Sequence, residues 1–306
     1  MTRSLLRGLL VLCLLCAAVL PAAGQTAPEP AASEPQAAEQ QPPDVQPPAR
    51  PAEIELNIIN LPTTRSLRRH QSYFRLTHRF ARDLRRGSFG QLAEDLFSLD
   101  AGAVIGLEYR FGITGNLQAG VHRSLLSKTI QLFGKFDGWR QGDAMPLSIS
   151  LIGSIEGLNN LQDDHQPAIA ASVSRVVDEW LVLYAAPAFV ANTRAADSLT
   201  GHDHDHDLPG AEQDEHSEHE HTAFLGLGTR VRLRPSVFVT GEYTPRLAGH
   251  DPGRGVWGVS IEKMTRGGGH TMQLNFTNSF GTTFGQLARG GSDHDIYLGF
   301  NITRKF

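Results

Sequence analysis

The feature that most constrains the fold is a recurring alternation of apolar and polar residues over about ten positions. The clearest example ends the chain. One face of this segment carries Ile296, Leu298, Phe300 and Ile302, and the other carries Tyr297, Gly299, Asn301 and Thr303. Because successive side chains of a strand point to opposite faces, the segment is predicted to be a strand with one apolar face. The terminal Phe306 falls on the same apolar face.

The same alternation predicts twelve strands. Their ranges are 71–80, 103–111, 116–124, 128–137, 146–156, 167–177, 180–192, 223–234, 236–244, 255–264, 271–280 and a last strand containing 296–303. An even number of strands of this length is typical of bacterial transmembrane barrels. The predicted fold is therefore all-β, a single antiparallel transmembrane β-barrel of about twelve strands. A further strand at 54–60 leaves the exact count open.

The connections between these strands alternate in length, as they do in outer-membrane barrels. If the first strand starts in the periplasm, the long connections lie outside the cell; these are 81–101, 157–166, 193–222, 245–254 and 281–294. The connection 125–127 is shorter than this scheme expects, and 138–145 is longer. In the first external loop, Leu92, Leu96 and Leu99 have helical spacing and predict a short helix over 88–99. It would form either a plug or lid at the barrel mouth or a satellite helix.

The polar faces of these strands carry charges of both signs. They are Arg75, Arg79, Glu108, Arg110, Lys135, Glu156, Arg230, Arg232, Arg234, Glu242 and Glu262. A Lys or Arg facing lipid costs about 2–4 kcal/mol at the bilayer midplane, so these side chains are expected to face the lumen. Either they cross-link into a filled lumen or they line a narrow aqueous channel. The sequence leaves both interpretations open.

The N-terminus resembles an export signal. Arg3 and Arg7 precede an apolar run from Leu9 to Leu20, and small residues follow before Gln25, so residues 1–24 are interpreted as a cleaved signal peptide. The alternatives are an uncleaved anchor and a lipoprotein acylated on Cys16. Residues 25–53 are rich in Ala, Pro, Glu and Gln and are interpreted as a disordered periplasmic linker. The barrel domain then spans 54–306.

Composition excludes several classes of protein. The formal net charge of −4 gives no support to a nucleic-acid-binding protein. Both cysteines lie in the leader, so a processed chain would have no thiol chemistry. The sequence contains no nucleophile elbow, Walker loop, zinc-protease motif or dinucleotide fingerprint. No catalytic residue and no required cofactor is predicted, although a Ser/His hydrolase remains formally open.

A histidine-rich tract lies in the external loop over 201–221. Its candidate metal ligands are His202, His204, His206, His216, His219, His221, Asp203 and Asp205. Imidazole and carboxylate groups suit Zn²⁺, Cu²⁺ or Ni²⁺, and alternate residues of an extended strand point the same way. Three interpretations stay open: a metal-capturing loop, a solvated loop whose metal affinity is incidental, and a loop whose charge responds to pH near 6.

Several stretches resemble a bacterial family described as a membrane-bound β-barrel domain of unknown function. They are the strand Gln71–Phe80, the segments Phe97–Asp100 and Gly112–Thr114, and the ending Gly299–Phe306. The resemblance covers roughly residues 55–306. It implies a barrel in the outer membrane and carries no catalytic residues with it.

The function expected from these features is that of an outer-membrane channel or ligand-binding conduit, involving divalent metal ions if the histidine tract takes part. The alternative is a closed barrel that acts as a binding or scaffold protein and displays a metal-capturing loop. A third alternative is a soluble periplasmic barrel. The expected partner is outer-membrane lipid, with divalent ions as further candidates. The ligand, the openness of the lumen and the oligomeric state are not encoded in any recognisable motif.

Overall fold

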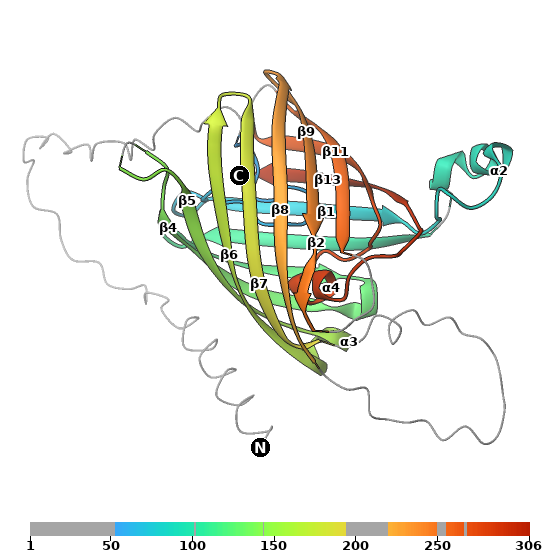
Figure 1. Cartoon of the computed structure of the whole chain (residues 1–306), viewed down its shortest axis with the longest axis horizontal. Helices are drawn as coiled ribbons and strands as arrows, with labels where there is room; N and C mark the ends of the chain where they lie inside the picture. Colours follow the sequence, from blue (N-terminus) through green and yellow to red (C-terminus); the bar gives the residue numbers. More distant parts are fainter. Residues whose placement is uncertain (1–52, 101, 143, 194–219, 250–254, 266–267) are drawn as a thin grey trace, which may run out of the picture. The chain divides into compact units, whose positions relative to one another are not determined.

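The structure is a computed structural model that describes residues 53–100, 102–142, 144–193, 220–249, 255–265 and 268–306. The described residues belong to one compact unit, residues 47–306, and the predicted leader and nearly all of the predicted linker lie outside them. Antiparallel strands dominate the unit (Figure 1). Their bounds are β1 (Ser72–Phe80), β2 (Ala103–Gly112), β3 (Leu117–Ser124), β4 (Ile130–Trp139), β5 (Ser148–Gly157), β6 (Asp163–Asp178), β7 (Leu181–Thr193), β8 (Glu220–Arg234), β9 (Val237–Thr244), β10 (Arg246–Ala248), β11 (Val256–Met264), β12 (His270–Thr277) and β13 (Tyr297–Lys305).

The sheet closes on itself into a barrel. Consecutive strands pair from β1 to β9, the chain of pairs continues through β11, β12 and β13, and β13 pairs with β1. Strand β10 follows β9 after Pro245 and pairs with β8, as β9 does. It therefore continues β9 beyond a proline, which cannot donate a hydrogen bond to the ladder. The described residues thus form the twelve-stranded barrel that the alternation predicts.

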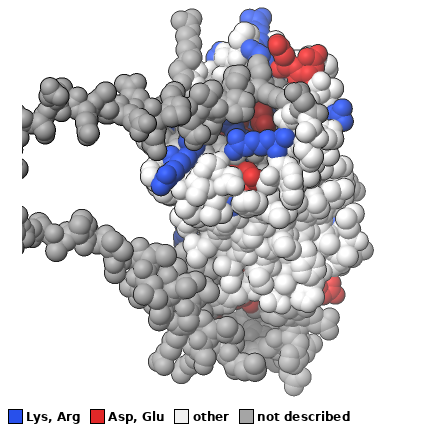
Figure 2. Space-filling model, turned by 90° about the vertical axis from the view of Figure 1, so that its left-hand side faces the viewer, with Lys and Arg blue, Asp and Glu red and all other residues white. Residues whose placement is uncertain are grey.

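The apolar faces of the strands point out of the barrel, as predicted. In β13, Leu298, Phe300 and Ile302 lie on the outer side, while Gly299 and Asn301 are buried on the inner side. In the middle of other strands, the outward side chains are large, apolar and about half exposed. They include Leu107, Leu151, Leu183, Ile261 and Leu274. Figure 2 shows one face of the barrel, with a broad band free of charged side chains and charges gathered along the upper edge. Such a band is the surface expected of a barrel in lipid.

The charged side chains point inward, with one departure from the prediction. Nine of the eleven predicted lumen charges are buried. Arg232 is only half-buried and Arg234 is exposed, because both stand at the end of β8 beside the turn to β9. The prediction of a lumen-facing side chain is wrong for Arg234, whereas Arg232 lies opposite the buried Phe238 of β9 and stays on the inner face.

The short connection between β3 and β4 and the longer one between β4 and β5 depart from the predicted topology, as the sequence indicated, whereas most of the long connections agree with it. Those that follow β1, β7, β9 and β12 are long, and the connection between β5 and β6 is shorter than expected because β6 already begins at Asp163. The predicted helix forms as α2 (Phe89–Glu94), with Ser88 and Gln91 in a reciprocal capping box, and a turn of 3₁₀ helix (Leu96–Ser98) follows. Figure 1 shows α2 projecting beyond the strand ends, so it is the satellite helix and not a lid. Among the described residues, no helix is long and apolar enough to cross a bilayer.

The segment 54–60 is not a strand of the barrel, which corrects the expectation of a further strand. Its residues are all buried, and among the described residues it makes one β-bridge, from Asn57 to Pro62 just beyond the segment. Its apolar residues are adjacent as well as alternate, as at Ile58 and Ile59, so both sides of the backbone need cover. A strand of a closed barrel has one side in lipid, whereas this segment finds cover on all sides inside the lumen.

Candidate functional site: a lumen occupied by two segments

Residues 54–64, here called the plug, fold into a tight reversal inside the barrel. The backbone N–H of Thr63 donates to the carbonyl of Leu56 (2.9 Å), and that of Ile58 donates to the carbonyl of Leu61 (2.8 Å). The apolar side chains of the plug, among them Leu56, Ile59 and Leu61, are fully buried. Burying each stabilises the arrangement by about 1.5–3 kcal/mol. The plug is therefore a packed element of the barrel interior.

Glu242 of β9 holds the tip of the plug. Its carboxylate accepts hydrogen bonds from three consecutive backbone N–H groups, those of Ile59 (3.0 Å), Asn60 (2.9 Å) and Leu61 (3.1 Å). A turn that exposes successive N–H groups forms a concave anion-binding surface. Here the anion is a side chain of the barrel wall, so one carboxylate fixes the position of the whole turn.

Four arginines of the wall hold the plug through its oxygens. Arg75 of β1 donates to the carbonyl of Ile59. Arg79, four residues further along the same face of β1, donates to Oδ1 of Asn60 (3.1 Å). The other two bind one plug residue from opposite sides. Arg110 of β2 donates to Oδ1 of Asn57 (2.5 Å), and Arg230 of β8 donates to its carbonyl (2.9 Å). Charged side chains of the wall thus bind oxygens of three residues of the plug, those of Asn57, Ile59 and Asn60.

The plug also fits the wall sterically. A Cβ added to Gly226 of β8 would lie 2.6 Å from Cδ2 of Leu61, and one added to Gly258 of β11 would lie 3.0 Å from Cδ1 of Ile59. Real Cβ atoms do not approach side chains as closely as the first of these distances. Glycine on the inner face therefore makes room for the plug, beyond any role in strand geometry.

At the base of the plug, Glu55 pairs with the last strand. Its Oε1 accepts from Nζ of Lys305 (3.1 Å) and from Oγ1 of Thr271 (2.6 Å). Burial raises the pKa of Glu55, but the Lys305 ammonium and these hydrogen bonds outweigh it and hold the pKa below its ordinary value. The carboxylate is therefore charged at neutral pH and ties the plug to β13.

A second segment enters the lumen from the opposite end. Residues 278–291, here called the inner loop, connect β12 to β13 and contain the short helix α4 (Phe284–Ala288), all of whose residues are buried. Thr283 caps this helix through the N–H of Gln286. Glu156 of β5 accepts from the N–H of Gly285 (2.9 Å) and from Oγ1 of Thr283 (2.9 Å). The inner loop is thus fixed to the wall at the start of its helix.

The plug and the inner loop meet at an apolar inner surface. Residues of both segments, of β5 to β8 and of β11 form one buried cluster. It comprises Ile58, Ile59, Leu61, Ile152, Ala170, Val182, Tyr184, Ala186, Ala188, Val190, Phe224, Val256, Phe284, Leu287 and Ala288. Strand β7 contributes a row of alternate residues to it while its other face points outward. A strand apolar on both faces in a transmembrane barrel therefore indicates that something packs inside.

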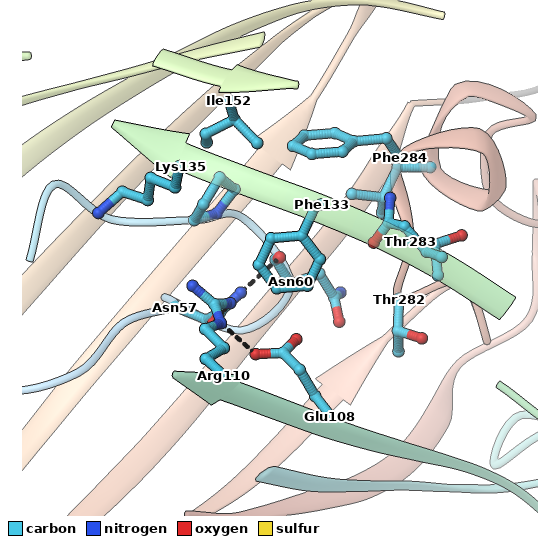
Figure 3. A pocket seen from close by; sticks show the side chains of 13 residues that line it. Asn57, Asn60, Glu108, Arg110, Phe133, Lys135, Ile152, Thr282, Thr283 and Phe284 are labelled. Atoms are coloured by element: carbon cyan, nitrogen blue, oxygen red, sulfur yellow. Dashed lines mark hydrogen bonds and ion pairs between the residues drawn. The ribbon is translucent and has the colours of Figure 1, made fainter. Parts of the chain in front are cut away.

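A cavity of about 30 Å³ lies between the two segments, and a second of about 10 Å³ lies beside Glu55 and Arg75. Figure 3 shows Arg110 between Glu108 and Asn57, with Lys135 on one side and Thr282 to Phe284 of the inner loop on the other. The Arg110 Nε donates to Glu108 (2.5 Å). The ring of His122 lies 3.2 Å from the other oxygen of Glu108 and 3.0 Å from Oγ1 of Thr282. A space of about 30 Å³ accommodates one or two water molecules, so the plug and the inner loop leave little room beside Arg110.

The sequence left open whether the inward charges fill the lumen or line a narrow aqueous channel. In the structure the lumen is filled, and the charged side chains bind the two inserted segments as well as each other. The sequence signals that were available are the apolar residues among Asn and Thr at 54–64 and the Thr283/Gln286 spacing of a helix cap. Neither by itself says that the segment lies inside the barrel.

Of the eight predicted metal ligands, the structure describes only His221. His202, His204, His206, His216, His219, Asp203 and Asp205 lie outside the described residues. His221 stands at the start of β8, exposed beside the ring of Phe189, and its Nδ1 accepts from the backbone N–H of Asn192 (3.4 Å). In the part of the chain that the structure describes, no three His, Cys, Asp or Glu side chains are grouped as metal ligands would be.

Comparison with known proteins identifies the family. Several solved structures resemble the chain in fold at low sequence identity. The COG4313 outer membrane channel of Pseudomonas putida F1 is 11% identical with a TM-score of 0.48, over 79% of this chain and 97% of that one. The Acinetobacter baumannii outer membrane protein Omp33 is 8% identical with a TM-score of 0.38, over 78% and 98%. Salmonella typhi OmpF is 7% identical with a TM-score of 0.37, over 77% and 97%.

No curated protein matches the sequence. The family described as "Membrane bound beta barrel domain (DUF5777)" matches residues 55–306, which include every strand and all of the plug except Ile54. Closed antiparallel barrels with an apolar outer belt are proteins of the outer membrane. The chain therefore belongs to this membrane-bound β-barrel family and is located in the outer membrane.

Proposed function

We propose that the protein is an outer-membrane channel for small polar solutes, closed at rest by the plug and the inner loop. The observation that carries the proposal is how the plug is attached. Side chains of the wall hold it, and no strand of the barrel forms a ladder with the described plug residues. It can leave the lumen without breaking a backbone hydrogen bond between barrel strands.

The chemistry of the wall supports a channel over a permanently closed scaffold. Arg75, Arg79 and Glu242 have side chains that are almost completely buried under the plug. Buried charges are costly unless paired, and a permanently filled interior is as stable or more so with apolar side chains. Charged side chains on the wall can be solvated by water, which would replace the oxygens of the plug in an open state. A catalytic role is no part of the proposal.

A reversible cross-link tests it. Oγ1 of Thr64 in the plug lies 2.6 Å from Oγ of Ser174 in β6, and residues 25–306 contain no cysteine. In planar bilayers, the double variant Thr64→Cys/Ser174→Cys is expected to be silent when oxidised and to open intermittently when reduced. The matched control is Thr240→Cys/Ser260→Cys, a Thr/Ser pair 2.5 Å apart that joins two wall strands. It should conduct equally under both conditions.

Two results would oppose the channel. One is a barrel that shows the heat-dependent gel shift of a folded protein yet never conducts with its plug reduced. The other is identical conductance in the oxidised and reduced plug variants, which would mean that ions pass without movement of the plug.

We keep metal capture by the tract 201–221 as a separate proposal. It rests on six histidines interleaved with Asp and Glu in one external connection. It requires neither an open lumen nor plug movement, so its test is independent of the channel.

A further inference from the structure

Two arginines of β1 stand at the tip of the plug and have donor groups to spare. Arg75 and Arg79 are 1% and 0% exposed, and both side chains lie on the inner face of the same strand. Nη1 of Arg75 and Nε of Arg79 are buried without a hydrogen-bond partner. A guanidinium group presents five N–H donors in one plane and is suited to oxygen pairs. These two are only partly satisfied in the closed barrel.

The acceptors that they do have are mostly neutral. Arg79 donates to Oδ1 of Asn301 (2.8 Å), to Oδ1 of Asn60 (3.1 Å) and to the carbonyl of His78 (3.1 Å). Arg75 donates to the carbonyl of Ile59, and its Nη1 lies 3.6 Å from Oε2 of Glu108. That carboxylate is already shared with Arg110 and His122. The plug therefore places amide oxygens where the wall has a surplus of positive charge.

Withdrawal of the plug would change this balance in a definite way. Arg75 and Arg79 would lose the oxygens of Ile59 and Asn60, and Glu242 would lose its three N–H donors. Two guanidinium groups and one freed carboxylate would then face water at the same level of the lumen. An oxyanion could take the positions of the plug oxygens and form charge-assisted hydrogen bonds, which are stronger than those to an amide oxygen.

We propose that Arg75 and Arg79 form an oxyanion-binding site in the opened lumen, for small solutes that carry a carboxylate or a phosphate group. In the closed barrel, the carbonyl of Ile59 and the side-chain amide of Asn60 occupy this site in place of the solute. The inference rests on the proposed channel and names the class of solute that it passes.

The test uses a variant that releases the plug but leaves the wall unchanged. Leu61→Asp places a carboxylate in the apolar cluster beneath the inner loop, where Leu61 is 0% exposed. Leu96→Asp, on the exposed outer loop, is its matched control. The heat-dependent gel shift verifies that each barrel is folded, and Leu56→Asp replaces the first variant if that one does not fold.

Selectivity is measured as the reversal potential in a KCl gradient across a planar bilayer. The plug-released barrel is expected to prefer chloride, and millimolar succinate or inorganic phosphate should block the current while neutral succinamide does not. Adding Arg75→Gln and Arg79→Gln should raise the half-blocking concentration at least tenfold. Adding Arg140→Gln, which removes one positive charge from an exposed position beside Ser66 and Gly115, should leave it within twofold.

The outcomes separate the two proposals. If the plug-released variant is folded and silent, the channel is rejected and the oxyanion site with it. If it conducts but prefers cations, or if the Gln variants are blocked as readily as their parent, the oxyanion site is rejected and the channel stands. Block by succinate alone or by phosphate alone assigns the site to carboxylates or to phosphates.

Discussion

The carboxylate of Glu242 in β9 accepts the backbone N–H of Asn60 through both of its oxygens, at 3.0 and 2.9 Å, across 182 positions of the chain. The neighbouring N–H groups of Ile59 and Leu61 converge on the same carboxylate. A single carboxylate thereby accepts from three buried backbone donors of the plug. Because three hydrogen bonds of the plug converge on Glu242, a substitution of Glu242 is the most direct test of how the plug is attached.

Replacing Glu242 by Gln is expected to loosen the plug. The amide keeps one acceptor oxygen and turns an NH₂ group toward N–H groups that need an acceptor. Hydrogen bonds to a charged group contribute about 1.5–3 kcal/mol each, and about 1.4 kcal/mol corresponds to a tenfold change in population. A cysteine reporter at the fully buried Leu61 should therefore react with a maleimide at least ~10-fold faster in this background. The exposed Glu94→Gln serves as the control, and equal labelling rates in the two would contradict the anchoring role.

Truncating Phe284 should destabilise the inner loop. This side chain is buried in the apolar cluster and its ring stacks on that of Phe224 with centroids 6.4 Å apart. Phe→Ala changes in a packed core cost about 3–5 kcal/mol. The Phe284→Ala barrel should therefore lose its gel shift at a lower temperature and show larger current noise. Phe89→Ala, on the exposed α2, removes the same atoms at 74% exposure and should leave both measurements unchanged. Matching behaviour of the two variants would argue against a packed inner loop.

Acid should release the base of the plug through Glu55. Because the pKa of this carboxyl is below its ordinary value, its stabilising charge is fully present above that value, 4.5, and is lost as the pH falls through the lowered pKa. Opening in planar bilayers is expected to be independent of pH near neutrality and to increase below about pH 4.5. In Glu55→Gln this acid response should be weaker and the neutral-pH opening more frequent, because Lys305 and Thr271 then face an uncharged amide. An unchanged pH profile would show that other groups control the opening.

The histidine tract should account for metal binding if the protein binds metal. Calorimetry with Zn²⁺, Cu²⁺ and Ni²⁺ compares the full chain with one that lacks residues 201–221. Loss of binding on deletion is the expected result, because imidazole is the commonest ligand for these ions and the tract contains six of the thirteen histidines. Equal affinity after deletion would place the site elsewhere, and no heat with either chain would leave the tract a solvated loop.

Local alternation was sufficient to predict the wall of the barrel. Leu298, Phe300 and Ile302 take the lipid side and Asn301 the inner side because the two-residue period of a strand admits one choice when one side is lipid. The same rule predicted the inward direction of Arg75, Glu108 and Glu242. It failed for Arg234, where the strand leaves the membrane and a charge can reach water from either face.

The contents of the lumen depended on tertiary structure. Nothing within residues 54–64 distinguishes a short strand from a plug, because Ile58 and Ile59 suit either until their surroundings are known. Those surroundings come from β8, β9 and β11, whose glycines and Glu242 lie about 170–200 positions further along the chain. Likewise, the Thr283 hydroxyl accepts the N–H of Gln286 and caps α4, and the carboxylate of Glu156 holds that cap inside the barrel. The sequence by itself determined which side of each strand faces lipid, since that choice is local, whereas closure of the lumen required contacts that only the assembled barrel brings together.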